Sequence, residues 1–335
     1  MLNHRVDSIA NLEAAIGPTP PAMHYKVIDH IDAGAADWIA RSPFMLAGIG
    51  QGADLRIALV GGRGGVVAER HALLLSGEAA AAVAIAQVGD PFGSLFLLPG
   101  IGETLRVNGR VTQVAGGSVR IDVRECYGHC AKALIRSEFW RAEPVEAPAR
   151  LDEFLAESRF LALATVGRSG DADVSPKGDP AGLLVQRDGE ALLFAERPGN
   201  RRADSYRNIL ECGHVALALL VPGARTVALA SGMATMTTDP VMLDRFRVDE
   251  KAPLMATRVT LDRIVITRSV ALADAALWPV RAKSDVDPAK LFVEHIRANK
   301  ASGVAASLAR ASLAVPGASH LLRKGLEKDY EENLY

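Results

Sequence analysis

The feature that most constrains the fold of this chain is an internal duplication. Turn and strand residues of the first half recur in the second. Pro99-Gly100 aligns with Pro222-Gly223, Gly109 with Gly232, Ser42 with Ser158 and Phe44 with Phe160. Each copy also ends near a tryptophan, Trp140 or Trp278. Such self-similarity indicates one structural unit present twice. The length of 335 residues likewise favours two domains.

Each copy is predicted to be a small antiparallel barrel. Short apolar runs separated by glycine turns predict strands over 44–49, 55–60, 66–69, 72–75, 94–98, 103–114 and 118–124 in the first copy. The second copy repeats the pattern over 160–166, 172–176, 182–187, 190–195, 215–220, 226–237 and 258–268. Predicted helices are few, with 77–88 and 127–140 in the first copy. Many short strands with few helices are typical of a barrel.

The expected protein is therefore mainly β (α+β), with two tandem barrels and a helical C-terminal tail. The expected parts are an arm without clear periodicity (1–24), a first unit (25–145), a second unit (150–280) and a helical extension (281–335). The Ala/Leu-rich stretch 302–326 is expected to pack across the barrels. A loose tail or a partner-binding helix is the alternative.

Composition excludes several classes of protein. The chain is 49% hydrophobic and 23% charged, as expected of a globular protein with a sizeable core. A net charge of −1 offers no electrostatic argument for nucleic acid or anionic membrane. No apolar run reaches the roughly 18 residues of a membrane span, and the N-terminus does not resemble a signal peptide. Three cysteines make no disulfide framework, so a cytoplasmic location is expected.

A metal site is not expected at Cys126, His129 and Cys130. These three residues lie on one short segment, and a closed zinc site needs a second cluster of ligands. A histidine in such a place more often packs or forms hydrogen bonds.

Two adjacent arginines form the most suggestive local pattern. The sequence predicts a helix over 201–210 with Asn200 as its N-cap. Arg201 and Arg202 would then lie in the first turn, where the helix macrodipole is already positive. A bound phosphate would resolve this conflict, because free N–H groups and guanidinium groups both suit it. A surface helix whose arginines pair with Asp204 or Glu196 is the alternative, and spacing alone does not decide.

Longer motifs resemble a bacterial subgroup of FMN-binding split-barrel proteins, in the pyridoxamine 5′-phosphate oxidase-like superfamily. They are Val174-Ser-Pro-Lys-Gly-Asp-Pro180, Arg197-Pro-Gly-Asn-Arg-Arg-Ala-Asp204 with Asn208-Ile-Leu210, Phe96-Leu-Leu-Pro-Gly-Ile-Gly-Glu-Thr-Leu-Arg-Val-Asn-Gly-Arg110, and His129-Cys-Ala-Lys-Ala133 with Arg136-Ser137 and Trp140. Together they touch most of residues 40–280. The resemblance implies a flavin between two barrels, which are usually contributed by a homodimer.

The motifs are divided between the two units, whereas the subgroup carries them in one barrel. The first unit keeps 103–110 and 129–132, and the second keeps 175–179 and 197–204. The missing motifs are replaced by 77–83 in the first unit and 226–231 in the second, which would offer a phosphate no cation. The expected architecture is an intrachain pseudo-dimer with one complete flavin site.

The resemblance implies a role for each motif in that site. Arg201 and Arg202 would hold the flavin phosphate, and Lys177 would reach ribityl or phosphate oxygens, unless it is only a turn lysine. Arg106, Asn108 and Arg110 alternate on one strand and share a face, so they would edge the isoalloxazine, unless that face is solvated. Lys132 would be a cation near flavin or substrate. The predicted cofactor-binding set is completed by Asn200, Arg197, Ser175 and Asp179.

The function implied is that of an FMN-dependent oxidoreductase acting on a small organic substrate or a reduced nicotinamide. The C-terminal Arg and His motif of true pyridoxamine 5′-phosphate oxidases is not visible, so that activity is not predicted. The alternatives are a non-catalytic protein that binds flavin, deazaflavin or haem, and a structural protein with an emptied site. The expected state is a monomer or weak homodimer, without nucleic acid or membrane. No residue identifies the substrate.

Overall fold

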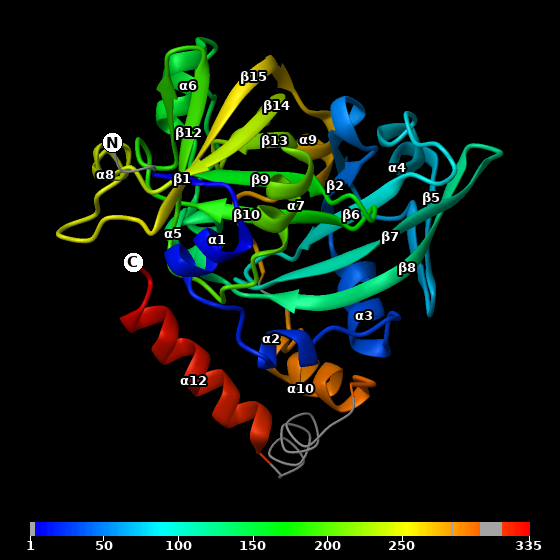
Figure 1. The fold of residues 1–335 in the computed structure, drawn as a ribbon. Helices are drawn as coiled ribbons and strands as arrows, with labels where there is room; N and C mark the ends of the chain where they lie inside the picture. Colours follow the sequence, from blue (N-terminus) through cyan, green and yellow to red (C-terminus); the bar gives the residue numbers. More distant parts are fainter. Residues whose placement is uncertain (1–3, 283, 302–316) are drawn as a thin grey trace.

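The computed structural model describes residues 4–282, 284–301 and 317–335, and Figure 1 shows two β-barrels with helices around them. The strands of the first unit are β2 (Phe44–Ile49), β3 (Arg56–Gly61), β4 (Val66–Glu69), β5 (Ala72–Ser76), β6 (Pro91–Leu97), β7 (Thr104–Ala115) and β8 (Ser118–His129). Those of the second are β9 (Phe160–Val166), β10 (Ala172–Gly178), β11 (Val185–Asp188), β12 (Ala191–Glu196), β13 (His214–Leu220), β14 (Thr226–Thr237) and β15 (Met255–Arg268).

The helices connect and cover these sheets. The first unit contains α3 (Ala33–Arg41), α4 (Gly77–Ala82) and α5 (Lys132–Arg136), with 3-10 turns at Gly52–Asp54 and Phe139–Arg141. The second contains α6 (Leu151–Glu157), α7 (Asp204–Cys212), α8 (Pro240–Asp244) and α9 (Val270–Ala275). Outside them lie β1 (Arg5–Val6), α1 (Ile9–Ile16), α2 (Ala22–Tyr25), α10 (Pro288–Ala298) and α12 (Ala318–Glu332).

The two sheets have the same topology, which confirms the tandem split barrels. The strand order is β3-β2-β6-β7-β8-β5-β4 in one sheet and β10-β9-β13-β14-β15-β12-β11 in the other. The aligned glycines Gly109 and Gly232 both lie where the ladder register shifts. A Cβ at Gly109 would approach the Asp122 carbonyl oxygen to 2.1 Å, and one at Gly232 would approach that of Thr260 to 2.0 Å. Both copies therefore need glycine at the same bulge.

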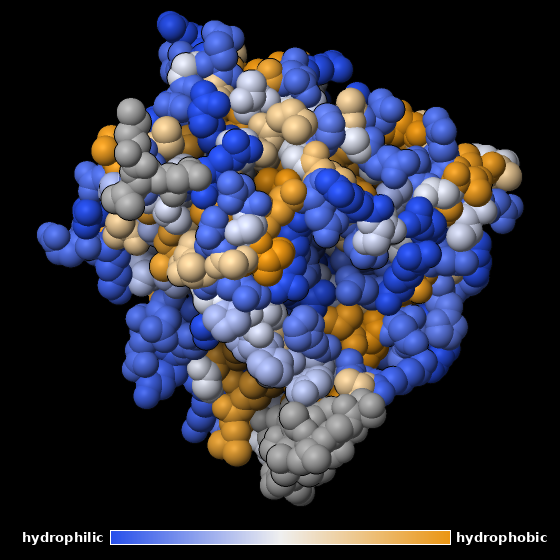
Figure 2. Space-filling model, in the orientation of Figure 1, coloured by the Kyte–Doolittle hydropathy of each residue, from blue (hydrophilic) through white to orange (hydrophobic). Residues whose placement is uncertain are grey.

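Three hydrophobic clusters explain why the central strands are apolar throughout. One cluster fills each barrel, and a third joins them. Along β9, Leu161 and Leu163 face the second barrel's core, whereas Phe160 and Ala162 face the cluster between the barrels. Because successive side chains point to opposite faces, a strand buried on both faces needs a continuous apolar run. The outer face seen in Figure 2 is mostly hydrophilic, with apolar side chains scattered in small groups.

The predicted helix over 127–140 is wrong in its first part. β8 continues to His129 because its last residues pair with β7, with Arg106 opposite Tyr127 and Leu105 opposite Gly128. This ladder supplies backbone hydrogen bonds that override the local helical pattern. Only α5 and the following 3-10 turn are helical.

The N-terminal arm is also more ordered than its sequence suggested. α1 begins after Ser8, whose hydroxyl oxygen accepts a hydrogen bond from the Asn11 N–H at 3.2 Å. Its Leu12 and Ile16, spaced one turn apart, are buried in the second barrel's core. β1 adds a short antiparallel strand to β14. The three prolines that follow α1 obscured this short amphipathic helix.

The C-terminal extension contains two helices in its described part. α10 packs against α12, which lies along the lower edge of the molecule in Figure 1. Residues 302–316 of the stretch predicted to pack across the barrels lie outside the described residues. Within the described chain, no helix combines the length and apolarity that crossing a membrane requires.

Candidate functional site

A small pocket lies between the two units and is lined by residues of both. The first unit contributes His129, Cys130, Ala133 and Arg136, and the arm contributes Ile16. The second unit contributes Ser175–Asp179, Ala195–Arg197, Gly199–Ala203 and Tyr206. Two motifs that lie far apart in the sequence therefore meet in space. The free volume is about 50 Å³, well below the roughly 300 Å³ of a typical ligand pocket, so covering residues must move to admit a flavin.

The arginine segment precedes its helix instead of forming the first turn. α7 begins at Asp204, so the predicted start at Arg201 is wrong. Arg201 has a φ of 55°, a left-handed conformation that an α-helix excludes. The Asn200 Oδ1 accepts a hydrogen bond from the Arg202 N–H at 3.0 Å, which forms an Asx turn instead of a helix cap. The Thr19 hydroxyl of the arm donates to the Arg201 carbonyl at 2.9 Å.

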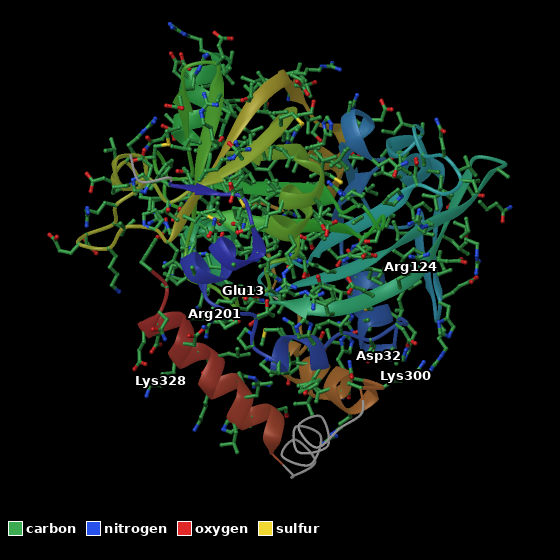
Figure 3. The ribbon with its side chains drawn as sticks, in the orientation of Figure 1. Glu13, Asp32, Arg124, Arg201, Lys300 and Lys328 are labelled. Atoms are coloured by element: carbon green, nitrogen blue, oxygen red, sulfur yellow. The ribbon has the colours of Figure 1, made fainter. Side chains whose placement is uncertain are left out.

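The two arginines differ in what they contact. The Arg202 side chain is only 6% exposed. It pairs with Asp204 and contacts Glu125 at 3.3 Å, and its guanidinium lies 4.2 Å from the centre of the Tyr127 ring. Pairing with Asp204 was the alternative expectation, but this arginine lies in the interior and not on a surface helix. Arg201 is exposed beside the end of α1 (Figure 3), and its guanidinium makes no hydrogen bond or ion pair within the described chain. It is the pocket's uncommitted cation.

Lys177 belongs to a partly buried polar cluster in the pocket wall and lies on the strand β10, not in a turn. Its Nζ lies 2.8 Å from the Glu196 carboxylate and 2.6 Å from the Tyr206 hydroxyl. Tyr206, on α7, also donates to Glu196. Burial and the neighbouring Glu196 raise the pKa of Tyr206 well above its usual value, so its hydroxyl stays protonated.

Arg197 and Asp179 form a second buried pair in the wall. The Arg197 Nε lies 2.9–3.0 Å from the two Asp179 oxygens. Burial raises the pKa of Asp179 to about 6 although Arg197 opposes the shift. The Arg197 Nη2 is buried without a hydrogen-bond partner in the described chain.

The donor set of the pocket suits an anionic, polar ligand. Five cationic side chains line it, against two carboxylates. Three lining residues also carry buried polar atoms without a described partner: His129 Nδ1, Arg197 Nη2 and Asn200 Nδ2. Since buried polar atoms are normally satisfied, these indicate a missing partner. Burial and nearby cations lower the pKa of His129 well below its usual value, so it is neutral. Among the described residues no group of His, Cys, Asp and Glu could hold a metal ion.

Four of the predicted residues do not line the pocket. Arg106 is buried, pairs with Asp173 and donates to Ser175 at 2.9 Å, which brings it to the pocket's outer wall. Asn108 contacts Glu125 at 3.0 Å. Arg110 donates to carbonyls of Gly89 and Ser169, and Lys132 pairs with Asp329 at 2.8 Å. Of the three β7 residues, Arg106 contacts a residue of the pocket lining, Ser175. Whether these three residues or Lys132 would contact a flavin stays a prediction.

Sequence reasoning missed Glu196, Tyr206, Arg136 and the orphaned His129. Glu196 was considered only as a surface partner for arginines, and His129 as a packing residue. Tyr206 lies three positions before the apolar Ile209 in the predicted helix, so the helix periodicity could have placed both on the buried face. Arg136 was part of a quoted motif but was not assigned to the site.

The pseudo-equivalent region is different. Leu229 replaces Arg106 there, and a shallow pocket includes Leu229–Ser231. Arg56 and Arg263 also line it, although neither lies in the segments 77–83 and 226–231 that were expected to lack a cation. Residues 77–83 do not line this pocket, and the expected second site formed by 77–83 and 226–231 stays a prediction. The Arg56 guanidinium donates to carbonyls of Ala53 and Leu55, which holds it against its own loop.

The fold and this pocket define a split-barrel protein with a cationic site between two barrels. Residues 147–276 match the family model described as pyridoxamine 5′-phosphate oxidase. The match covers the second unit, which is therefore similar to the pyridoxamine 5′-phosphate oxidase-like split-barrel superfamily; members of this family typically bind a flavin. A comparison with curated proteins finds no match.

Several solved structures are similar to one unit. HupZ of Group A Streptococcus is 17% identical, with 34% of this chain and 88% of that chain covered and a TM-score of 0.28. An F420 reductase is 22% identical, with 35% and 97% covered and a TM-score of 0.27. General Stress Protein 26 from Bacillus anthracis str. Sterne is 15% identical, with 35% and 95% covered and a TM-score of 0.27. These weak likenesses carry no argument about function.

Proposed function

We propose that the chain binds one FMN between its two barrels and is an FMN-dependent oxidoreductase. The observation that carries this proposal is the cationic pocket, built by both units, in which three buried polar atoms lack partners among the described residues. Bound FMN would supply hydride or electron transfer, with a small organic molecule or a reduced nicotinamide as the reaction partner.

The residues of the second unit would hold the phosphate end. Arg201 is uncommitted, and the unpartnered Asn200 Nδ2 belongs to the same turn. Arg202 is already paired with two carboxylates, so its main task is to hold the turn in place. Lys177 and Tyr206 offer hydrogen bonds to ribityl oxygens from the opposite wall, where Glu196 fixes both. The cost of the left-handed Arg201 conformation is consistent with a functional constraint at this residue.

A haem-binding role is the second candidate, because neutral His129 lines the pocket with an unpartnered Nδ1. Imidazole is a common iron ligand. The visible spectrum of the purified protein separates the candidates, since a bound haem shows a Soret band and a bound flavin shows flavin bands. Reduction by a nicotinamide in stopped flow then separates an enzyme from a protein that only binds flavin.

The FMN assignment is tested by titration. We expect saturation at one FMN per chain, because only one of the two pseudo-equivalent regions carries the arginine turn. A charge-assisted hydrogen bond contributes about 1.5–3 kcal/mol, so Arg201→Ala should weaken FMN binding by about one to two decades. Replacing Arg202 as well should increase the loss. Arg141→Ala, which removes an exposed arginine outside the pocket, is the matched control.

An unchanged affinity in Arg201→Ala, or saturation at two FMN per chain, would overturn the assignment. The proposal includes a cytoplasmic protein that works as a monomer, because one chain supplies both walls of the pocket. A homodimer is therefore not needed to complete the site.

A further inference from the structure

Three buried cations gather where α5 meets the end of α12. The exposed fractions of Lys132, Arg136 and Arg197 are 4%, 9% and 5%. Arg136 and Arg197 line the pocket between the barrels. Arg136 also lines a neighbouring groove of about 1330 Å³, whose wall includes Leu334 and Tyr335. Arg136 therefore lies at the boundary between a small pocket and a wide groove.

Arg136 lacks a carboxylate partner among the described residues. Its Nε donates to the Gly178 carbonyl at 3.0 Å, and its Nη1 donates to those of Pro198 at 3.3 Å and Leu334 at 2.7 Å. Neutral carbonyls are weaker partners than an oxyanion, which forms charge-assisted bonds of roughly twice the strength. A buried guanidinium without a counter-ion is costly, so an anion in the place of Leu334 would be favoured.

Arg197 offers the second half of such a site. Asp179 occupies its Nε, but its buried Nη2 has no partner in the described chain. The ring of Tyr335 covers the guanidinium, with 5.4 Å between its centre and Cζ. An anion that reached both arginines would satisfy the orphaned donor.

The segment that covers the arginines is only lightly docked. None of the side chains described in α12 or in 333–335 is fully buried, and α12 lies at the periphery of the molecule in Figure 1. It is fastened mainly by polar contacts: Lys132 with Asp329 at 2.8 Å, Tyr330 with Glu103 at 3.1 Å, and Lys251 with the Tyr335 carbonyl at 3.0 Å. Segments with few buried apolar contacts open at low free-energy cost.

We propose that Arg136 and Arg197 form a subsite for an oxyanion, a carboxylate or a phosphate, and that residues 333–335 cover it until such an anion displaces them. This inference rests on the proposed function, because the anion would be the group by which the second substrate docks beside the flavin. Displacement would also join the small pocket to the groove and supply the room that a substrate needs.

Hydrogen exchange of the full chain tests the proposal. The backbone amides of 326–335 are followed without anion, with inorganic phosphate and with acetate, at constant ionic strength. We expect at least one of the two anions to raise their exchange severalfold. Arg136→Gln should abolish this response, whereas Arg141→Gln, which changes an exposed arginine of the same groove, should keep it.

A second variant keeps the proposal testable if Arg136→Gln does not fold. Tyr335→Ala leaves the cations intact and removes the ring over Arg197, so we expect faster exchange without anion and tighter anion binding by calorimetry. Failure of both anions to change exchange in the wild-type chain would overturn the subsite. So would unchanged exchange and anion affinity in Tyr335→Ala.

The same experiment separates this subsite from the FMN phosphate end. The subsite predicts that Arg201→Ala keeps the exchange response. A response lost in Arg201→Ala but kept in Arg136→Gln would place the anion at the arginine turn and overturn the subsite. A normal response in a chain that binds no FMN would leave the subsite standing and refute the proposed cofactor.

Discussion

At the scale of single residues, the site contains an ionisable group, the Asp179 carboxyl, whose burial disfavours its charged form. Asp179 is 2% exposed, and burial raises its pKa to about 6 from a usual 3.8. Between these two values the folded chain holds a proton that the unfolded chain has lost. Stability contributed by the protonated group is therefore fully present below about pH 3.8 and is lost as the pH rises through about 6.

This predicts a pH dependence that Asp179→Asn removes. The free energy of unfolding of the wild type, relative to the variant, should rise as the pH falls from about 7 to about 4, by up to about 3 kcal/mol. Urea denaturation at a series of pH values measures the difference. The slope is the readout, because Asp179→Asn also removes the ion pair that the ionised carboxylate forms with Arg197. A difference that does not change with pH would contradict the raised pKa.

At the scale of elements, the two barrels are joined by a buried ion pair between β7 and β10. Arg106 is 1% exposed and pairs with Asp173, which also accepts hydrogen bonds from Ser175 and Ser205. The Tyr127 hydroxyl lies 3.1 Å from the Arg106 Nη1. Arg106 therefore links a strand of the first unit to a strand and a helix of the second.

Arg106→Met should destabilise the protein by about 3–5 kcal/mol, because it leaves the Asp173 charge buried without its partner. Adding Asp173→Asn should recover part of the loss. Chemical denaturation measures both. Arg120 lies on β8, the neighbour of β7, and forms a half-exposed pair with Glu69 of β4, so Arg120→Met should cost less than about 1 kcal/mol. Equal losses in the two arginine variants would refute a structural role for the buried pair.

At the scale of the whole molecule, the pseudo-two-fold arrangement repeats the contacts between units. Gly61 and Gly178 end the equivalent strands β3 and β10, opposite Phe44 and Phe160. A Cβ at Gly61 would lie 1.8 Å from the Ala271 carbonyl oxygen, and one at Gly178 would lie 1.8 Å from that of Ala133. Each contact joins one barrel to the helical segment of the other.

Gly61→Ala and Gly178→Ala should each destabilise the protein by about 1–3 kcal/mol or more, because backbone must move to admit the methyl group. Thermal unfolding measures the loss. Gly128→Ala is the control, since its methyl group would meet only ordinary contacts. If Gly61→Ala proved harmless while Gly178→Ala did not, the two contacts would not be equivalent.

The sequence by itself determined the repeated unit, the strand-rich class and the positions of most strands, because alternation and glycine turns are local signals. β9 and β14 have the predicted bounds, 160–166 and 226–237. The quoted motifs also indicated which segments meet. These properties depend on residues close together in the chain or on its resemblance to itself.

Only the tertiary structure decided how the site residues are used. Arg201 and Arg202 are adjacent in sequence, yet one is exposed and uncommitted and the other is buried between two carboxylates. The arginine segment forms an Asx turn that hydrogen-bonds to the arm, and residues 127–129 pair with β7 as a strand. The residue that covers Arg136 is Leu334, which lies in the C-terminal extension, 198 positions further along the chain. Burial and partner choice depend on contacts between distant segments, and local patterns carry no record of them.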